Sequence, residues 1–461
     1  MSKTREVLFF DPDELSDLQK EIGVPRIPSE GMDLDKPIDE AISMFYLEFR
    51  KVIWYTVGLV ELVKNSGRNA DISYEIDKKY HYLTRTYFTI QIPPLRLTKE
   101  AKRKYRVRWP PNLGHQIIPK GGFYVDGEPW QTLDNEWCDA NMHWFEKTGH
   151  GFRDLRQRDI GNVPYMHEFS DALPEYRLTP EQPWFYARDS SRAFPLFRCS
   201  FMSKVDHKFI FNLDIMKLIQ IQDVETGKIL EFGESAPPKG ITNEIFVNRL
   251  SEIPEPKLWG EYSINHSREF ECLDKNSKYP IYVDDISHSS SDNPQTYGSV
   301  VPMKLNTSIY PTKALFWMAE NLNAKKKHIF SNYTTNEEDA FRGWNPIGSV
   351  SFKGKKGRKF DDLPSEHFDR KSAFHFSSAP FQNGYNAYSF CNEPNALDIE
   401  PGIVLGSNDE SISFRLKDTN PVVDDENSST ENKFTVHLFQ LVTKKMVLNR
   451  EFNIMTNKDL A

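Results

Sequence analysis

The chain has 461 residues, which suits two domains of about 200 residues each. Its net charge is −8 at pH 7, and 13% of its residues are aromatic. Because phosphate neutralisation dominates nucleic-acid binding, the acidic balance argues against a protein that coats a genome directly. The cysteines (Cys138, Cys199, Cys272 and Cys391) are too far apart in the sequence for a CxxC zinc or redox motif, which indicates free thiols.

Residues 1–65 are predicted to form an arm with a helix. Apolar residues recur there every three or four positions, at Ile38, Ile42, Phe45, Phe49, Ile53 and Val57. This spacing predicts a helix over 36–64, although the segment could also begin as a helix and end as a strand at Val52–Val60. The apolar stripe would pack on the chain's own first domain or on a partner protein.

From about residue 70 the apolar period becomes two, which is typical of half-buried strands. Asp126-Gly127 predicts a tight hairpin turn after Gly121–Val125, because Asp-Gly adopts the positive φ that such turns need. A short helix is predicted at Asp139–Lys147. Strands are predicted at 72–76, 86–95, 121–125, 194–201, 208–213, 216–222 and 229–232.

Residues 250–257 are predicted to be a linker between two domains, because two closely spaced prolines favour an extended chain. A second series of short strands follows at 258–264, 279–283, 298–305, 314–318, 348–352, 384–390, 411–416 and 433–441. The sequence therefore predicts two all-β sandwiches, at 66–249 and 258–461. The pattern alone does not separate a jelly roll from an immunoglobulin-like topology.

Several segments resemble the double jelly-roll major capsid proteins of large eukaryotic DNA viruses and of polinton and adintovirus elements. They lie in the family's order between about residues 80 and 415, at 112–118, 122–130, 135–144, 183–196, 310–317 and 386–390. The resemblance rests chiefly on 112–144, 183–196 and 310–317. The first begins with Asn112-Leu113-Gly114-His115-Gln116-Ile117-Ile118, which is similar to a family strand, and the last is Tyr310-Pro311-Thr312-Lys313-Ala314-Leu315-Phe316-Trp317. The family's usual motif after 386–390 is much altered, and only Glu400-Pro401-Gly402 and Ser413-Phe414-Arg415 are similar to it.

The resemblance implies two tandem eight-stranded jelly-roll sandwiches with an N-terminal helical arm and a few short helices. It implies a homotrimer that forms a pseudo-hexameric capsomer and tiles an icosahedral virion shell, assembled in the host cytoplasm or a viral factory. Partners would be neighbouring capsomers, minor capsid or cement proteins and penton proteins, with an internal membrane as a further candidate and no sequence-specific nucleic acid. No enzymatic activity, no cofactor and no catalytic, cofactor-binding or metal-binding residue is expected.

Two other functions stay open at this point. A minor capsid or scaffold protein could share the fold, and a carbohydrate-binding β-sandwich could use Trp130, Trp137 and Trp144, which recur every seven residues. His115, Cys138, Asp139 and His143 match no standard zinc spacing, so a metal site is not predicted. Glu225-Thr226-Gly227-Lys228 has the end of a phosphate-loop motif, but Ile221 stands where that motif needs glycine, so a turn is predicted.

Each of three further sequence features allows two structural interpretations. Trp184, Phe185 and Tyr186 would lie on a strand and fill the core, or meet a neighbouring jelly roll. Arg188 and Asp189 would form an ion pair within a turn, or an inter-subunit contact. The basic run 353–359 would be a solvated loop, or would contact an acidic neighbour, lipid headgroups or the genome.

Overall fold

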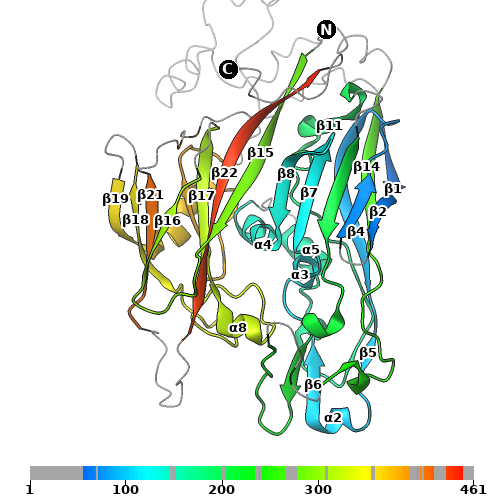
Figure 1. Ribbon diagram of the computed structural model, residues 1–461, viewed down its shortest axis with the longest axis vertical. Helices are drawn as coiled ribbons and strands as arrows, with labels where there is room; N and C mark the ends of the chain where they lie inside the picture. Colours follow the sequence, from blue (N-terminus) through cyan, green and yellow to red (C-terminus); the bar gives the residue numbers. More distant parts are fainter. Residues whose placement is uncertain are drawn as a thin grey trace, which may run out of the picture. The chain divides into compact units, whose positions relative to one another are not determined.

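The computed structural model describes residues 55–449, except 69–70, 146–151, 200–203, 234–237, 239–240, 266–277, 307–309, 355–358, 395–401, 403–404, 406–409 and 420–431. The predicted arm before residue 55 and most of the basic run 353–359 therefore lie outside the described residues. The described chain forms two antiparallel β-sandwiches with short helices between and around them (Figure 1). In the described part of the chain, no helix combines the length and hydropathy needed to cross a membrane.

The first jelly roll consists of two five-stranded sheets. One contains β1 (Tyr55–Glu61), β14 (Lys257–Asn265), β4 (Tyr82–Ile92) and β10 (Tyr176–Leu178) in this order, with β11 (Phe194–Pro195) also paired to β4. The other contains β2 (Val63–Arg68), β3 (Asp71–Glu75), β12 (Val205–Ile210), β7 (Lys120–Val125) and β8 (Glu128–Asp134). This part of the chain also forms two two-stranded sheets. One pairs β13 (Gln220–Asp223) with β6 (Tyr105–Arg108), and the other pairs β5 (Leu95–Arg96) with β9 (Ala172–Leu173). The first sandwich thus has more strands than the expected eight.

The second jelly roll consists of two four-stranded sheets. One has the order β15 (Lys278–Ser290), β22 (Phe434–Asn449), β17 (Thr312–Asn321) and β20 (Asn386–Ser389). The other has the order β16 (Val300–Lys304), β21 (Ser411–Leu416), β18 (Ile347–Lys353) and β19 (Lys359–Pro364). Among its described residues, this sandwich has the eight strands that were expected.

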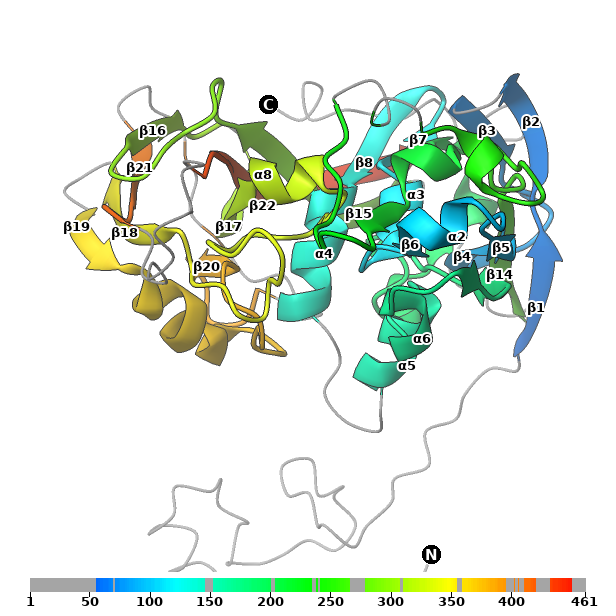
Figure 2. The same cartoon turned by 90° about the horizontal axis from the view of Figure 1, so that it is seen from below.

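The helices are short. Those of the first jelly roll are α2 (Ala101–Lys104), α3 (Leu113–Ile117), α4 (Asn135–Trp144), α5 (Phe152–Asp159) and α6 (Pro164–His167), with single turns η2 (Ser190–Arg192), η3 (Leu196–Arg198), η4 (Ile215–Lys217) and η5 (Asn243–Ile245). Those of the second are α8 (Leu322–Lys326), η7 (His367–Lys371) and η8 (Ser372–His375). Helix α4 lies between the two sandwiches in both views (Figures 1 and 2).

The strand after the predicted linker belongs to the first jelly roll. β14 forms as a strand, but it pairs with β4 on one side and with β1 on the other, with Trp259 opposite Tyr87 and Glu61. The sequence predicted that residues 258–264 belong to the second sandwich, whereas in the structure they pair with strands of the first. The prolines before β14 mark the end of a loop. The alternation of apolar residues in the strand, however, does not determine with which sheet the strand pairs.

Some local predictions were wrong. Residues 55–61 are a strand, as the alternative for the arm had it, and the predicted helix does not extend to residue 64. The segment 113–117 is a helix where the resemblance indicated a strand, and of the described residues 194–199 of the predicted strand 194–201, only Phe194–Pro195 form a strand. The hairpin at Asp126-Gly127 is confirmed, with φ of 52° and 86° at the two turn residues.

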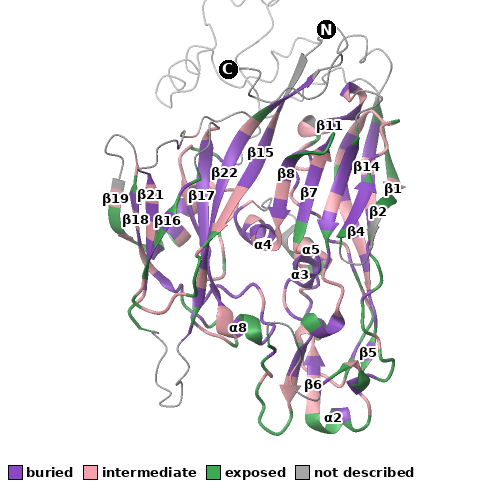
Figure 3. Ribbon diagram, in the orientation of Figure 1, coloured by how far each residue is buried: buried purple, intermediate pink, exposed green. Residues whose placement is uncertain are grey.

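Strand β17 is buried along its whole length because its two faces pack into different cores. Phe316 and Met318 pack with residues of the first jelly roll, whereas Leu315 and Trp317 pack inside the second sandwich. Since successive side chains of a strand point to opposite sides, one strand serves both layers. Buried residues accordingly run through α4 and through the strands on both sides of it (Figure 3).

Candidate functional site

The feature that organises this molecule is the contact between its two jelly rolls. Its centre is aromatic: the ring of Trp137 on α4 lies edge-on to Phe316 of β17, at 5.1 Å between centroids, and 5.8 Å from Phe439 of β22. Trp144, two turns further along α4, lies 6.3 Å from Phe316. All of these rings are buried, with Trp137 only 2% exposed. Burial of this kind is the main stabilising contribution to such a contact.

Asp284 on β15 collects polar side chains from both jelly rolls. Lys313 Nζ lies 3.0 Å from its Oδ1, and Thr443 Oγ1 donates a hydrogen bond to the same oxygen at 2.8 Å. From the first jelly roll, Arg188 donates to Oδ2 and Arg192 Nη1 lies 3.6 Å from it. The carboxylate is thus a shared acceptor that fastens one sandwich to the other.

The charge of Asp284 is maintained despite its burial. Burial alone would raise the pKa of this carboxyl, but the adjacent Arg188 and Lys313 charges outweigh it and hold the pKa below the ordinary value. Neighbouring backbone contacts add to the fastening: Gln131 Nε2 donates to the carbonyl oxygen of Asp284 at 2.7 Å, and its Oε1 accepts from the N–H of Phe185 at 2.9 Å.

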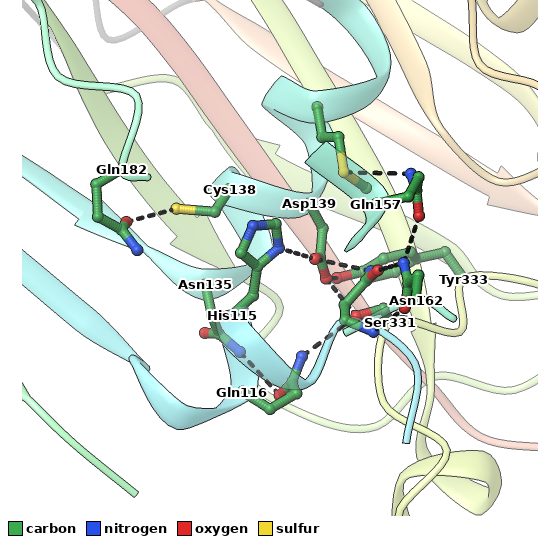
Figure 4. Close-up of polar contacts among 12 residues, drawn as sticks. His115, Gln116, Asn135, Cys138, Asp139, Gln157, Asn162, Gln182, Ser331 and Tyr333 are labelled. Atoms are coloured by element: carbon green, nitrogen blue, oxygen red, sulfur yellow. Dashed lines mark hydrogen bonds and ion pairs between the residues drawn. The ribbon is translucent and has the colours of Figure 1, made fainter. Parts of the chain in front are cut away.

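A second buried carboxylate, Asp139 on α4, makes a comparable cluster (Figure 4). Its Oδ1 lies 2.6 Å from His115 Nδ1 and accepts from Asn112 Nδ2 at 3.0 Å. Its Oδ2 accepts from the hydroxyls of Ser331 and Tyr333, which belong to the loop after α8. The first pair of donors comes from the first jelly roll and the second pair from the second, so Asp139 also joins the two.

The residues that were weighed as a metal site are not brought together as one. His115 contacts Asp139, but Cys138 points to Gln182, with 3.0 Å between Sγ and Oε1, and His143 packs against Tyr385 at 4.1 Å between ring centroids. Among the described residues, no group of three or more His, Cys, Asp and Glu side chains could hold a metal ion. Burial, with the nearby Asp139 charge, raises the pKa of the Cys138 thiol well above its ordinary value.

The aromatic residues singled out from the sequence are core residues. Trp130 and Trp144 are 0% exposed, and with Trp137 they offer no open groove for a sugar. Trp184, Phe185 and Tyr186 are all buried in the core of the first jelly roll, although they lie in a turn and not on a strand. These residues were predicted either to fill the core or to meet a neighbouring jelly roll, and the structure shows them in the core.

Sequence reasoning missed the second-domain side of the contact. Asp284 and Asp285 stand as consecutive acidic residues inside the otherwise apolar strand 279–286, which is an unusual position for charges because a buried carboxylate needs partners. This signal could have identified a polar cluster. No comparable signal exists for Ser331 and Tyr333, which lie in a loop.

Comparison with known proteins agrees with this geometry. Residues 43–233 match the family described as the major capsid protein N-terminus. The major capsid protein of Lymphocystis disease virus 1 is 22% identical over 84% of this chain and 84% of its own length, and that of Trichoplusia ni ascovirus 2c is 21% identical over 91% and 88%. Among solved structures, the Faustovirus major capsid protein superimposes with a TM-score of 0.68 at 7% identity, covering 95% of this chain and 97% of its own. A PBCV-1 capsid protein superimposes with a TM-score of 0.65 at 13% identity, covering 89% and 99%.

The fold is that of the double jelly-roll capsid proteins, and the expected resemblance to them is confirmed. The sequence matches extend the likeness over most of the chain and over most of each relative. Taken with the fold, they make the chain similar over most of its length to viral major capsid proteins.

Proposed function

We propose that this protein builds the virion shell as a homotrimer, in which three copies of two jelly rolls form a pseudo-hexameric capsomer of an icosahedral capsid. The observation that carries the proposal is the buried contact between the two sandwiches. Asp139, Asp284 and the aromatic rings around Trp137 join the two sandwiches within one chain. A ring of three chains would therefore present six sandwiches in a fixed arrangement. A threefold ring closes through a contact between two different surfaces of the same chain.

Edge strand β1 supports such a contact. Within the part of the chain that the structure describes, it pairs with β14 alone, and Val57 and Leu59 on one of its faces are 53% and 50% exposed. Exposed apolar side chains on a sheet edge are an aggregation hazard unless another chain covers them. A neighbouring copy of this chain is the occupant that fits a shell protein.

The remaining expectations become part of the same proposal. The protein would have no enzymatic activity, and minor capsid or cement proteins, penton proteins and an internal membrane would be further contacts. We place the division between the jelly rolls after β14, and not at 250–257, because β14 completes the first sheet.

Light scattering coupled to size-exclusion chromatography tests the trimer. The expected mass is three times the chain mass of 53.7 kDa at micromolar concentration. A stable monomer at that concentration would contradict the proposal. Abundance separates a major from a minor capsid protein: the chain should dominate the stained gel of purified particles, and a trace band would favour a minor capsid or scaffold role.

A further inference from the structure

A row of four ionisable side chains crosses between the jelly rolls at the start of α4. Asp134, at the end of β8, places Oδ2 3.0 Å from Nδ1 of His288 on β15. Nε2 of His288 lies 3.0 Å from Nδ1 of His437 on β22. His437 Nε2 in turn lies 3.5 Å from Oε2 of Glu320 on β17. Two imidazoles thus stand in line between two carboxylates.

The groups around this row are also charged. Lys325 of α8 lies 2.9 Å from Glu320 Oε2, and Glu136 in the first turn of α4 is close enough to His437 and Glu320 to interact electrostatically with both. Burial would raise the pKa of Glu320, but His437 and Lys325 outweigh it and hold the pKa at about 2. Burial raises the pKa of Glu136, against the effect of His437. The carboxylate at the buried end of the row is therefore ionised at neutral pH.

The row needs a particular number of ring hydrogens. The contact with Asp134 requires a hydrogen on His288 Nδ1, and the contact with Glu320 is favourable only with a hydrogen on His437 Nε2. The short contact between the rings requires one hydrogen between them. Three ring hydrogens satisfy every contact, whereas two neutral imidazoles carry two and two imidazolium ions carry four.

We propose that His288 and His437 hold one extra proton between them and form a pH-sensitive latch that fastens the two jelly rolls most tightly when the pair carries a single positive charge. The inference concerns the seating of the two sandwiches within one chain and does not depend on the proposed trimer. Both Asp134 and His288 are about a quarter exposed, at 27% and 23%, so protons can reach the row from solvent.

The latch weakens on both sides of its optimum. When the pair loses the extra proton, one ring nitrogen turns a lone pair toward a carboxylate. When the pair gains a second proton, His288 Nε2 and His437 Nδ1 point two N–H groups at each other across 3.0 Å. The Asp134–His288 contact joins β8 to β15, so its loss weakens the junction of the jelly rolls, whereas the clash between the two rings lies between β15 and β22 and displaces His288 from that junction.

Nitrogen-15 NMR of the histidine-labelled full chain tests the proton count directly. Resonances of His288 and His437 are assigned from the variants His288→Gln and His437→Gln. At the pH of greatest thermal stability, we expect three of the four ring nitrogens of the pair to carry a hydrogen. Two neutral rings, or two imidazolium rings, throughout the range from about pH 5 to 8 would overturn the proposal.

Melting temperature as a function of pH tests the latch. The wild-type curve should pass through a maximum and fall by about 2–4 °C on each side of it. In Asp134→Asn, the amide of Asn can itself donate a hydrogen bond to an unprotonated His288 Nδ1, so this contact no longer needs a ring hydrogen. The decrease in melting temperature on the alkaline side should therefore disappear, and the decrease on the acidic side should remain. His437→Gln should remove both, and His367→Gln, at an exposed histidine outside the row, should keep the wild-type shape.

The comparison between variants tests whether the histidine pair causes the pH dependence of the melting temperature, even if one variant folds poorly. Asp134 lies at the more exposed end of the row, so Asp134→Asn leaves the buried pair of Glu320 and His437 in place. A curve for Asp134→Asn with the same alkaline fall as the wild type would contradict the latch. So would a wild-type curve with no maximum.

Discussion

Arg188 and Asp284 are 96 residues apart in the sequence, and they form an ion pair across the boundary between the two jelly rolls. The arginine follows the buried aromatic turn 184–186, and the aspartate lies in the middle of β15. Lys313 and Thr443 contact the other oxygen of the same carboxylate. The position of the turn in the first sandwich is thereby tied to the register of three strands in the second.

Replacement of Asp284 by Asn should destabilise the protein by about 3–5 kcal/mol, because it leaves buried cations without their anion. The measurement is urea unfolding followed by tryptophan fluorescence. Since the folded pKa of Asp284 lies below its ordinary value of 3.8, its contribution is present above that value and is lost as the pH falls through the folded pKa. The difference between wild type and variant should therefore shrink only in acid.

Asp418→Asn is the matched control for this experiment. Asp418 pairs with Arg415 at 3.6 Å on the surface, where it is 73% exposed. Exposed pairs contribute little, so a loss below about 1 kcal/mol is expected. Equal losses for the two variants would show that the buried cluster does not hold the jelly rolls together.

The two faces of β17 should respond differently to truncation. Phe316→Ala opens the contact with Trp137, whereas Trp317→Ala opens the core of the second sandwich, where Trp317 packs on Phe368 and Phe414. Each should cost about 3–5 kcal/mol. Limited proteolysis distinguishes them: the Phe316 variant should be cut first in segments that join the jelly rolls, and the Trp317 variant within the second one. Identical cleavage patterns would argue against two separate cores.

Buried Cys138 should resist alkylation in the native protein. Its thiol lies 3.0 Å from Gln182 Oε1, and burial raises its pKa, so little thiolate forms at neutral pH. In a background with Cys199, Cys272 and Cys391 replaced by serine, reaction with iodoacetamide at pH 8 should be at least about 100-fold slower than in urea, as the thiolate is the reactive form. Mass spectrometry follows the modification, and a rate similar to that of the unfolded chain would contradict the packing of α4.

Local sequence patterns were informative where the local period decides the structure. The alternation around Ile72 and Tyr74 and the Asp126-Gly127 turn predicted β3 and the β7–β8 hairpin, because side-chain period and turn chemistry are local properties. Partner choice is not local. The strand at 258–264 was assigned to the second sandwich, whereas β14 pairs with β4 and β1, a choice that the alternation of its side chains does not specify.

The contact between the jelly rolls could not be predicted for the same reason. Asp139 was weighed from the sequence only as part of a metal site, yet its acceptor role depends on Ser331, which is 192 residues away. Two hydroxyls in a loop carry no periodic signal. The resemblance to capsid proteins supplied the fold and the function, whereas the residues that join the sandwiches had to be read from the structure.

A glycine beside this contact gives the last prediction. Gly384 has a φ of +98°, and a side chain there would collide with the backbone carbonyl of Tyr333, whose hydroxyl reaches Asp139. Gly384→Ala therefore combines backbone strain with a backbone collision, and we expect a loss above about 3 kcal/mol. Gly127→Ala is the matched control, because Gly127 also has a positive φ, +86°, but faces open space. It should lose about 1 kcal/mol in the same urea titration. Equal losses would mean that the approach of Tyr333 to Gly384 does not constrain the protein.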